Sequence, residues 1–449
     1  MPARQPLLRL SIVSGEQVDE RSPEGSPVPS TPRPWPRRLL GRLVIDTRPL
    51  RYPAYRRLWA STVVTSIGSQ LTTVAVPKQI YDLTSSSGYV GLAGVFGLVP
   101  LVVFGLWGGA IADAVDRRKL LLVTNAGIAV TSLLFWAQAA LDNQSVWLVL
   151  GLLAVQQGLF AVNMPARSAS IPRLIPEALL PSANALGMTV MQFGAVMGPL
   201  LAGVMLPVLG LSTLYLVDTL ALVATLWAVW RLPPLPPLGE RPSRAGLRDI
   251  VDGFRYLATR GVLLVSYLAD IIAMVAGMPR ALFPEMAAHN FGDSGGGALG
   301  WLFAGIPVGA LLCGLLSGWA SRISRQGLAV TVSVCVWGLA IVGFALSPTL
   351  PIAVFFLAVG GAADFISMVF RGSMLQAAAT DEMRGRMQGV FNVVVAGGPR
   401  LADVVHGSAG VVVGATAAAA GGGILTVVLM LAAAVAVPSF LRYRADSAR

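Results

Sequence analysis

Several ionisable side chains lie inside long apolar stretches of this sequence, where a charge is costly and usually functional, and among them are Asp270, Asp364, Arg400 and Asp403. Asp270 is the tenth residue of its stretch, which places it roughly 15 Å deep in a helix rising about 1.5 Å per residue. Removal from water penalises the ionised form of a carboxyl group, a property that suits a proton carrier. We therefore expect Asp270 to carry protons, with Arg400 and Asp403 as candidate partners and Asp364 as a further coupled group.

Arg400 and Asp403 are three positions apart, so they can pair within one helix. A purely structural ion pair explains these two residues equally well. Asp364 shares its stretch with Arg371, which we expect at the end of that stretch.

Twelve apolar stretches, each near the ~20 residues that a helix needs to cross a bilayer, account for most of the chain after Arg57. Their predicted bounds are 58–80, 90–112, 120–141, 146–164, 183–206, 211–230, 261–283, 298–321, 328–346, 351–370, 387–413 and 416–437. With 55% hydrophobic and 12% charged residues, a soluble globule is excluded. Because lipid cannot satisfy backbone polar groups, the sequence predicts an all-α polytopic membrane protein of twelve transmembrane helices.

The basic residues show which side of the membrane each loop faces. Of the 33 basic residues, 11 lie in the segment that ends at Arg57, and most others fall in alternate loops. This positive-inside pattern predicts a protein of the cytoplasmic (inner) cell membrane with both termini cytoplasmic. It also explains the net charge of +11 without nucleic acid as a partner.

The chain repeats itself weakly. Arg167 and Arg371 follow the fourth and tenth stretches, and Gly203 and Gly407 lie further on, each pair 204 positions apart. This spacing predicts two pseudo-symmetric six-helix bundles with a substrate path between them. The expected organisation is a disordered cytoplasmic tail (1–50), an N-terminal bundle (51–232), a cytoplasmic linker with an amphipathic helix (233–260), a C-terminal bundle (261–441) and a cytoplasmic C-terminus (442–449).

The loop after the second stretch combines Gly109, Asp113, Asp116, Arg117 and Arg118. A glycine lets a neighbouring helix approach closely, and a carboxylate one turn later can face the positive start of another helix. This arrangement resembles the loop after helix two in the major facilitator superfamily. The acid at the later position, Asp116, makes this loop similar to the same loop in the branch of siderophore (enterobactin-type) and multidrug exporters. The resemblance implies a cytoplasmic gate in which Asp113 contacts the start of helix eleven and holds the outward-open state.

The fifth stretch contains a second motif, formed by Gly194, Gly198, Pro199 and Gly203. Glycines four apart form a smooth face for helix packing, and proline favours a kink. The motif resembles the antiporter motif of drug–proton exchangers in the same superfamily, with Ala202 at one of its later glycines. The resemblance implies that the motif lies between helices five and eight and favours export over uptake.

Apolar and amide side chains in the spans could form a substrate cavity. We assign to it Gln70, Met191, Phe193, Met274 and Phe391. At helical spacing, core packing explains the four apolar side chains equally well.

Together these features predict a proton-driven exporter of small amphipathic molecules, such as a siderophore or lipophilic drugs. Its expected partners are a small-molecule substrate, protons and membrane lipid, and we expect a monomer. A proton-coupled or facilitative importer of a nutrient is the first alternative, and a non-transporting membrane receptor or scaffold is the second. No nucleophile–base set, cofactor loop, metal cluster or P-loop occurs in the sequence, so we expect neither an enzyme nor a cofactor.

Overall fold

The computed structural model of this chain describes residues 46–236, 255, 257, 259–293, 295–378 and 381–444. All of them belong to the compact unit Ile45–Arg449. Every element in these ranges is helical, as predicted for an all-α membrane protein. Residues 1–45 of the predicted tail, most of the predicted linker and residues 445–449 lie outside the described ranges.

The first half of the chain forms five long helices. They are α2 (Pro53–Thr84), α3 (Ser87–Ala114), α4 (Arg117–Ala140), α5 (Val146–Ser170) and α6 (Leu180–Trp230). The short helix η1 (Arg48–Arg51) precedes them, and Asp46 accepts a hydrogen bond from Ser182 at 2.6 Å. The tail boundary predicted at residue 50 is therefore wrong for residues 46–50, which already contact the body of the protein.

The second half begins with α8 (Gly261–Ile271), which continues into the π-helical turn η4 (Ile272–Ala276). The short helix η5 (Arg280–Leu282) leads into α9 (Phe283–Asn290). The remaining helices are α10 (Gly297–Leu315), η6 (Ser317–Arg322), α11 (Gln326–Ala345), α12 (Leu350–Ala378), α13 (Asp381–Val413), α14 (Ala415–Ala436) and α15 (Pro438–Leu441). Asp270 is thus followed at once by a π-helical turn, a feature often found at functional sites.

The twelve predicted spans all fall on these helices, although only nine stretches of the described chain are long and apolar enough to cross a membrane on their own. One of the nine, Glu177–Trp230, has 54 residues and covers two predicted spans. Gly210 divides it with φ 75° and ψ 171°, a conformation that essentially only glycine adopts. The other two predicted spans lie on α2 and α13, which are too polar to be recognised by hydropathy alone.

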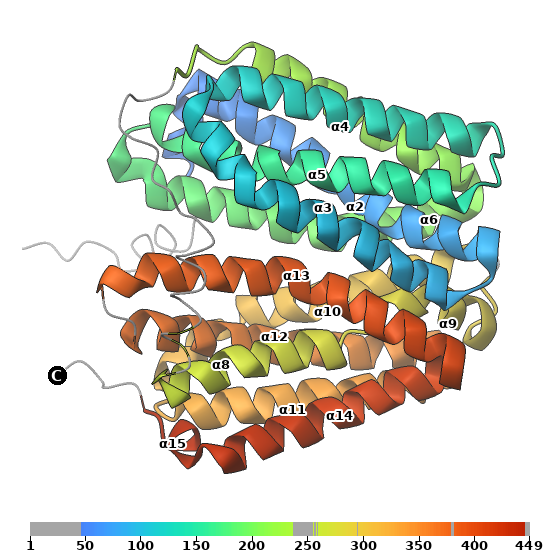
Figure 1. The fold of residues 1–449 in the computed structure, drawn as a ribbon, viewed down its shortest axis with the longest axis vertical. Coiled ribbons are helices and arrows are strands. Elements are labelled where there is room, and N and C mark those ends of the chain that lie inside the picture. The colour runs from blue at the N-terminus through green and yellow to red at the C-terminus, as the bar shows by residue number, and fades with distance from the viewer. Residues whose placement is uncertain are drawn as a thin grey trace, which may run out of the picture. The chain divides into compact units, whose positions relative to one another are not determined.

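The helices pack in two groups (Figure 1). In the first half, α6 packs against α2 and α4, and α3 packs against α5. In the second half, α12 packs against α10 and α11, and α14 packs against α11. The most extensive contacts between the halves are those of α3 with α13 and of α6 with α10.

Both ends of the described chain lie at one end of the helices, on the left in Figure 1. The loop containing Arg117 and Arg118 lies there too, so we call it the basic end. The opposite end carries the turns at 85–86, 141–145, 291–296 and 346–349 and the turn at Gly414.

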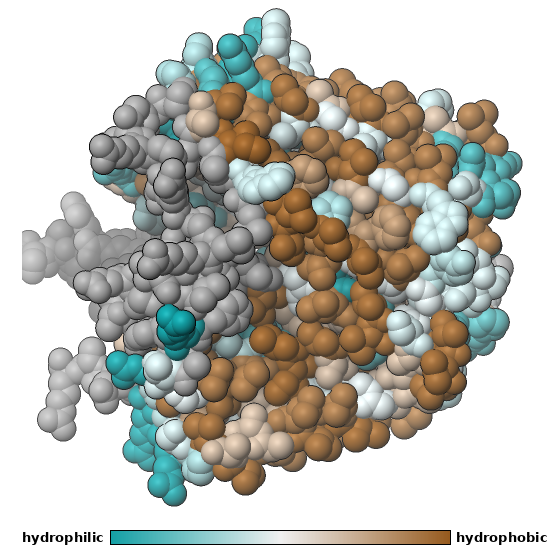
Figure 2. Space-filling model, viewed as in Figure 1, coloured by the Kyte–Doolittle hydropathy of each residue, from teal (hydrophilic) through white to brown (hydrophobic). Residues whose placement is uncertain are grey.

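Large apolar side chains cover the surface between the two ends (Figure 2). Val123, Leu220, Leu339 and Val435 are among those with more than half of their surface exposed. Soluble monomers rarely expose apolar patches of this extent. The belt therefore faces lipid, and the chain is a multi-pass membrane protein.

Candidate functional site

A buried ion pair lies in the second half of the protein. The Asp270 carboxylate on α8 pairs with the Arg371 guanidinium on α12, and the two residues are only 2% and 4% exposed. Arg371 Nη2 also lies 3.9 Å from Oδ1 of Asp364, and its Nε donates to the Ser367 carbonyl oxygen at 3.4 Å. Arg371 is therefore placed between two carboxylates that compete for one guanidinium.

Further charges extend this pair towards the first half. The Arg280 guanidinium interacts electrostatically with the carboxylates of Asp364 and Asp403. The Asp403 carboxylate also interacts with the guanidinium of Arg400. We call the whole set the charge chain, which runs Asp270, Arg371, Asp364, Arg280, Asp403, Arg400. Its three carboxylates and three guanidiniums alternate in sign, so a single added proton changes a balanced set into one with a net positive charge.

Arg400 connects the charge chain to the first half. Its Nη2 donates to Gln157 Oε1 on α5 at 2.6 Å, and its Nη1 donates to the Ala396 carbonyl oxygen at 2.9 Å. The described residues contain no Arg400–Asp403 ion pair. The Arg400 guanidinium donates hydrogen bonds to these two acceptors instead of forming the expected ion pair with Asp403. Asp270 likewise pairs with Arg371 and not with Arg400, a contact that the sequence analysis did not anticipate.

A cavity of about 10 Å³ adjoins the ion pair. It is lined by Ser266, Tyr267, Asp270, Arg371, Leu375 and Phe391. This is close to the minimum of roughly 10 Å³ that one water molecule needs. The ring of Phe391 lies edge-on to Tyr267, with centroids 6.4 Å apart. Asp270 therefore has room beside it for about one water molecule.

The other residues assigned to a substrate cavity are dispersed. Gln70 packs against Gly198, and Met274 packs against Gly398. Met191 and Phe193 are 64% and 48% exposed. The structure does not bring these four residues together with Phe391 around one of the described cavities.

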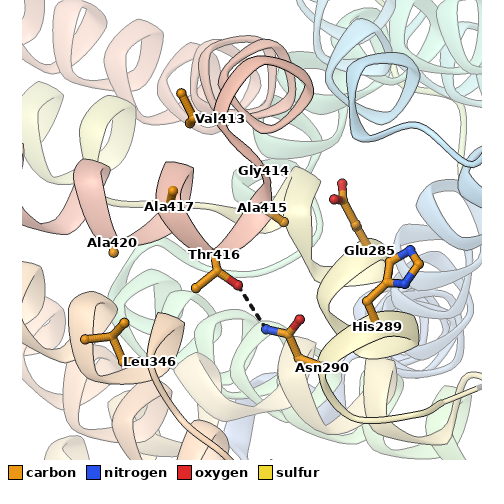
Figure 3. Close-up of a pocket in the computed structure, with 10 residues that line it drawn as sticks. All are labelled: Glu285, His289, Asn290, Leu346, Val413, Gly414, Ala415, Thr416, Ala417 and Ala420. Carbon is orange, nitrogen blue, oxygen red and sulfur yellow. Dashed lines mark hydrogen bonds between the residues drawn. The ribbon is translucent and has the colours of Figure 1, made fainter.

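A second pocket, of about 480 Å³, lies at the opposite end (Figure 3). Glu285, His289 and Asn290 on α9 form its polar side, and Asn290 donates to Thr416 Oγ1 at 3.1 Å. Its volume is within the range of small-molecule sites. The sequence analysis missed it because the pocket depends on the turn at Gly414, which has φ 82°.

Close backbone contacts join the halves near the opposite end. Between α3 and α13, a Cβ on Gly91 would lie 2.6 Å from the Asp403 carbonyl oxygen and 2.9 Å from Gly407 Cα. Between α6 and α10, a Cβ on Gly203 would lie 2.9 Å from the Gly297 carbonyl oxygen and 3.1 Å from Gly300 Cα. We call these two contacts the glycine seams. Gly203 and Gly407, which match in the sequence repeat, occupy equivalent places in them.

The antiporter motif is divided between two helix contacts. Gly194 and Gly198 pack against Ser66 and Gln70 of α2, whereas the backbone of Pro199 and Gly203 meets Gly300 of α10. The implied position between helices five and eight is therefore wrong for its first two glycines. Positions 194 and 198 share one helix face, and positions 199 and 203 share the next face.

The gate motif is described only in part. The surroundings of Gly109 and the side chain of Asp113 lie outside the described set, although both residues belong to α3. Arg117 Nη1 donates to the Ala169 carbonyl oxygen at 3.1 Å, and Arg118 Nη2 donates to the Trp230 carbonyl oxygen at 2.6 Å. These carbonyls end α5 and α6, where a cation is favoured by the helix dipole.

Asp116 caps the start of α4. Its carboxylate accepts hydrogen bonds from the backbone N–H groups of Arg118 at 2.8 Å and Lys119 at 3.3 Å. We expect Asp116→Ala to lower the free energy of unfolding by about 1 kcal/mol, because these N–H groups lose their acceptor. The check is the thermal midpoint in detergent. Asp116→Asn keeps a capping oxygen and should match the wild type, whereas an unchanged midpoint in the alanine variant would contradict the capping role.

Solved structures with this fold are membrane transporters. A bacterial homologue of the human lysosomal transporter Spinster, in an inward-facing and unoccupied conformation, matches with a TM-score of 0.68 and 18% identity, covering 90% of this chain and 100% of that one. The nucleoside transporter NupG matches with a TM-score of 0.69 and 12% identity, covering 87% and 99%. The chain therefore shares the fold of these membrane transporters.

The chain belongs to the MFS_3 family, described as transmembrane secretion effectors, whose model matches residues 46–448. It is similar to proteins named Enterobactin exporter EntS from Shigella boydii serotype 18 and from Escherichia coli O81. Each is 29% identical over 364 residues, covering 81% of this chain and 86% of the relative. The predicted membership of the superfamily, a transporting rather than enzymatic role and membrane embedding are confirmed.

Proposed function

We propose that this protein exports small amphipathic molecules, a siderophore or lipophilic drugs, across the cytoplasmic membrane by proton antiport. The observation that carries the coupling is the Asp270–Arg371 ion pair, buried beside room for about one water. The family description and the exporter names of its relatives support the outward direction. The positive-inside pattern supports a cytoplasmic basic end, and the protein acts as a monomer.

The structure then corresponds to the inward-facing state. The glycine seams close the opposite end, which faces outwards, and substrate enters from the cytoplasm or the inner leaflet. The halves rock about a central cavity so that each end opens in turn. The loop with Asp113 controls the basic end, and residues 51–232 and 261–441 are the two moving bundles. The tail before residue 46 and the linker (233–260) are on the cytoplasmic side in this proposal.

Coupling follows from the competition for Arg371. When Asp270 is ionised, Arg371 is bound to it. A proton on Asp270 removes that attraction and leaves Asp364, 3.9 Å away, as the charged partner. Because Asp270 and Arg371 belong to different helices, α8 and α12, this exchange changes the packing of the second half. The proton drives transport only because the two states bind it with different affinity.

Counterflow in proteoliposomes tests the direction. With enterobactin as the probe and a proton gradient imposed across the vesicle, antiport predicts accumulation of enterobactin in the compartment from which protons leave. Collapse of the gradient with an ionophore should reduce accumulation to the level in empty vesicles. Accumulation in the same direction as proton movement would instead support the importer. If enterobactin only reaches equal concentrations on both sides of the vesicle membrane, whatever the proton gradient, coupling to protons is contradicted.

A further inference from the structure

A second buried carboxylate lies in the first half, far from the charge chain in sequence. Asp218 on α6 is only 3% exposed. Its Oδ2 accepts hydrogen bonds from Thr72 Oγ1 at 2.9 Å and from Ser132 Oγ at 2.8 Å. Gln156 Nε2 donates in turn to Ser132 Oγ at 3.1 Å. Four helices, α2, α4, α5 and α6, therefore direct oxygen-bearing side chains at one point.

The surroundings of Asp218 contain no compensating cation. Among the described residues, no lysine, arginine or histidine forms an ion pair with it. The facing groups on α2, α4 and α5 are the hydroxyls of Thr72 and Ser132 and the amide of Gln156, all neutral. On α6 itself the nearby titratable group is Tyr215, whose hydroxyl donates to Gln79 Oε1 at 2.9 Å. A buried carboxylate is costly unless a positive charge neutralises it.

The packing leaves space for the carboxylate. Gly68 on α2 faces it, and a Cβ at that position would lie 2.7 Å from Asp218 Oδ1. Any other residue at 68 would press on the carboxylate, so glycine lets α2 and α6 meet around it. A carboxylate can bind a proton while neighbouring hydroxyls form hydrogen bonds with it. Carboxylate and hydroxyl oxygens can also coordinate a small hard cation.

We propose that Asp218, with Thr72 and Ser132, binds a small monovalent cation, either a proton or a sodium ion, inside the first half. The bound cation neutralises the carboxylate and holds α2, α4 and α6 together. This site is separate from the charge chain and does not depend on proton antiport. It gives the first half a cation site of its own, whereas the coupling site proposed above lies in the second half.

Infrared spectroscopy of the purified full-length protein distinguishes the two cations. If a proton is bound, the spectrum at neutral pH contains a carboxylic acid C=O band that Asp218→Asn removes. Asp82→Asn is the matched control, because Asp82 is exposed and paired with Lys78 at 2.6 Å. It should remove only ionised carboxylate absorption. If sodium is bound, Asp218→Asn removes no acid band from the spectrum. Instead, sodium chloride raises the thermal midpoint of the wild type to a saturating value that choline chloride does not reach. The midpoint of Asp218→Asn does not respond to sodium in this way.

A second pair of variants guards against misfolding of Asp218→Asn. Thr72→Val and Ser132→Ala each remove one oxygen from the site. For a bound proton, losing a donor to the ionised form makes the acid band persist to higher pH. For sodium, each variant requires a higher salt concentration for half of the thermal shift. The proposal is overturned if Asp218→Asn removes only carboxylate absorption and sodium has no effect that choline lacks.

Discussion

Replacing Asp270 with asparagine is expected to reduce substrate-driven proton flux to the background of empty vesicles. Asparagine keeps the size of the side chain but can neither release a proton nor attract Arg371, with which Asp270 is paired. Loss of one partner leaves the buried guanidinium uncompensated, and breaking a buried ion pair in this way costs about 3–5 kcal/mol. The variant should therefore also unfold at lower denaturant concentration. The measurements are a pH-sensitive dye in proteoliposomes and chemical unfolding in detergent.

Two controls separate coupling from folding. The double variant Asp270→Asn/Arg371→Gln removes both charges, so it should recover most of the lost stability without recovering proton flux. Asp82→Asn changes an exposed carboxylate near the opposite end and should leave both measurements unchanged. Wild-type proton flux in Asp270→Asn would remove this residue from the coupling role.

Adding one methyl group to a glycine seam is expected to shift the balance between the two transport states. In Gly407→Ala the new Cβ would lie 2.6 Å from the Ser87 carbonyl oxygen and close to Gly91, so α3 and α13 must separate. Overpacking of this kind costs about 1–3 kcal/mol. If the cost falls on the state described here, its population falls by roughly 5- to 150-fold relative to the other state.

Spectroscopic distances between spin labels at the opposite end measure this shift. Asp142 and Thr349 are exposed there, one in each half, and labels on them should report a longer distance in Gly407→Ala. Gly421→Ala on α14 is the matched control, because a Cβ at Gly421 meets nothing within 4 Å. Gly203→Ala should have a similar effect through the α6–α10 seam. A distance distribution in Gly407→Ala equal to that of the control would show that the seam does not set the equilibrium.

The helices were predictable from the sequence because crossing lipid requires length and apolarity. Each stretch of sequence shows both properties without reference to residues elsewhere in the chain. Even α2 and α13, which are too polar for a hydropathy threshold, contain stretches predicted to span the membrane, at 58–80 and 387–413. The two spans predicted at 183–206 and 211–230 follow each other within α6, where Gly210 separates them. The sequence placed the division between the spans, but it did not reveal the conformation of Gly210 that makes it.

The candidate site was only partly predictable. Depth along a helix follows from counting residues, and Asp270 is indeed buried. Its partner Arg371 lies about a hundred positions away in sequence, and their meeting depends on how α8 and α12 are rotated about their axes. Gln157 gave no signal because it is one of three amide residues in its span, with Gln156 and Asn163, and the sequence does not show which of them meets Arg400. The divided antiporter motif shows the same limit, since adjacent residues face different neighbours.

The glycine seams also bear on how fast the protein can work. Their helices approach each other through backbone atoms, because the glycines at these contacts have no Cβ. No long side chain at Gly91, Gly203, Gly300 or Gly407 has to change rotamer before the helices part. We therefore expect that, in the proposed transport cycle, separation of the helices at these seams is fast and that the slow step is the exchange of partners around Arg371 or substrate release.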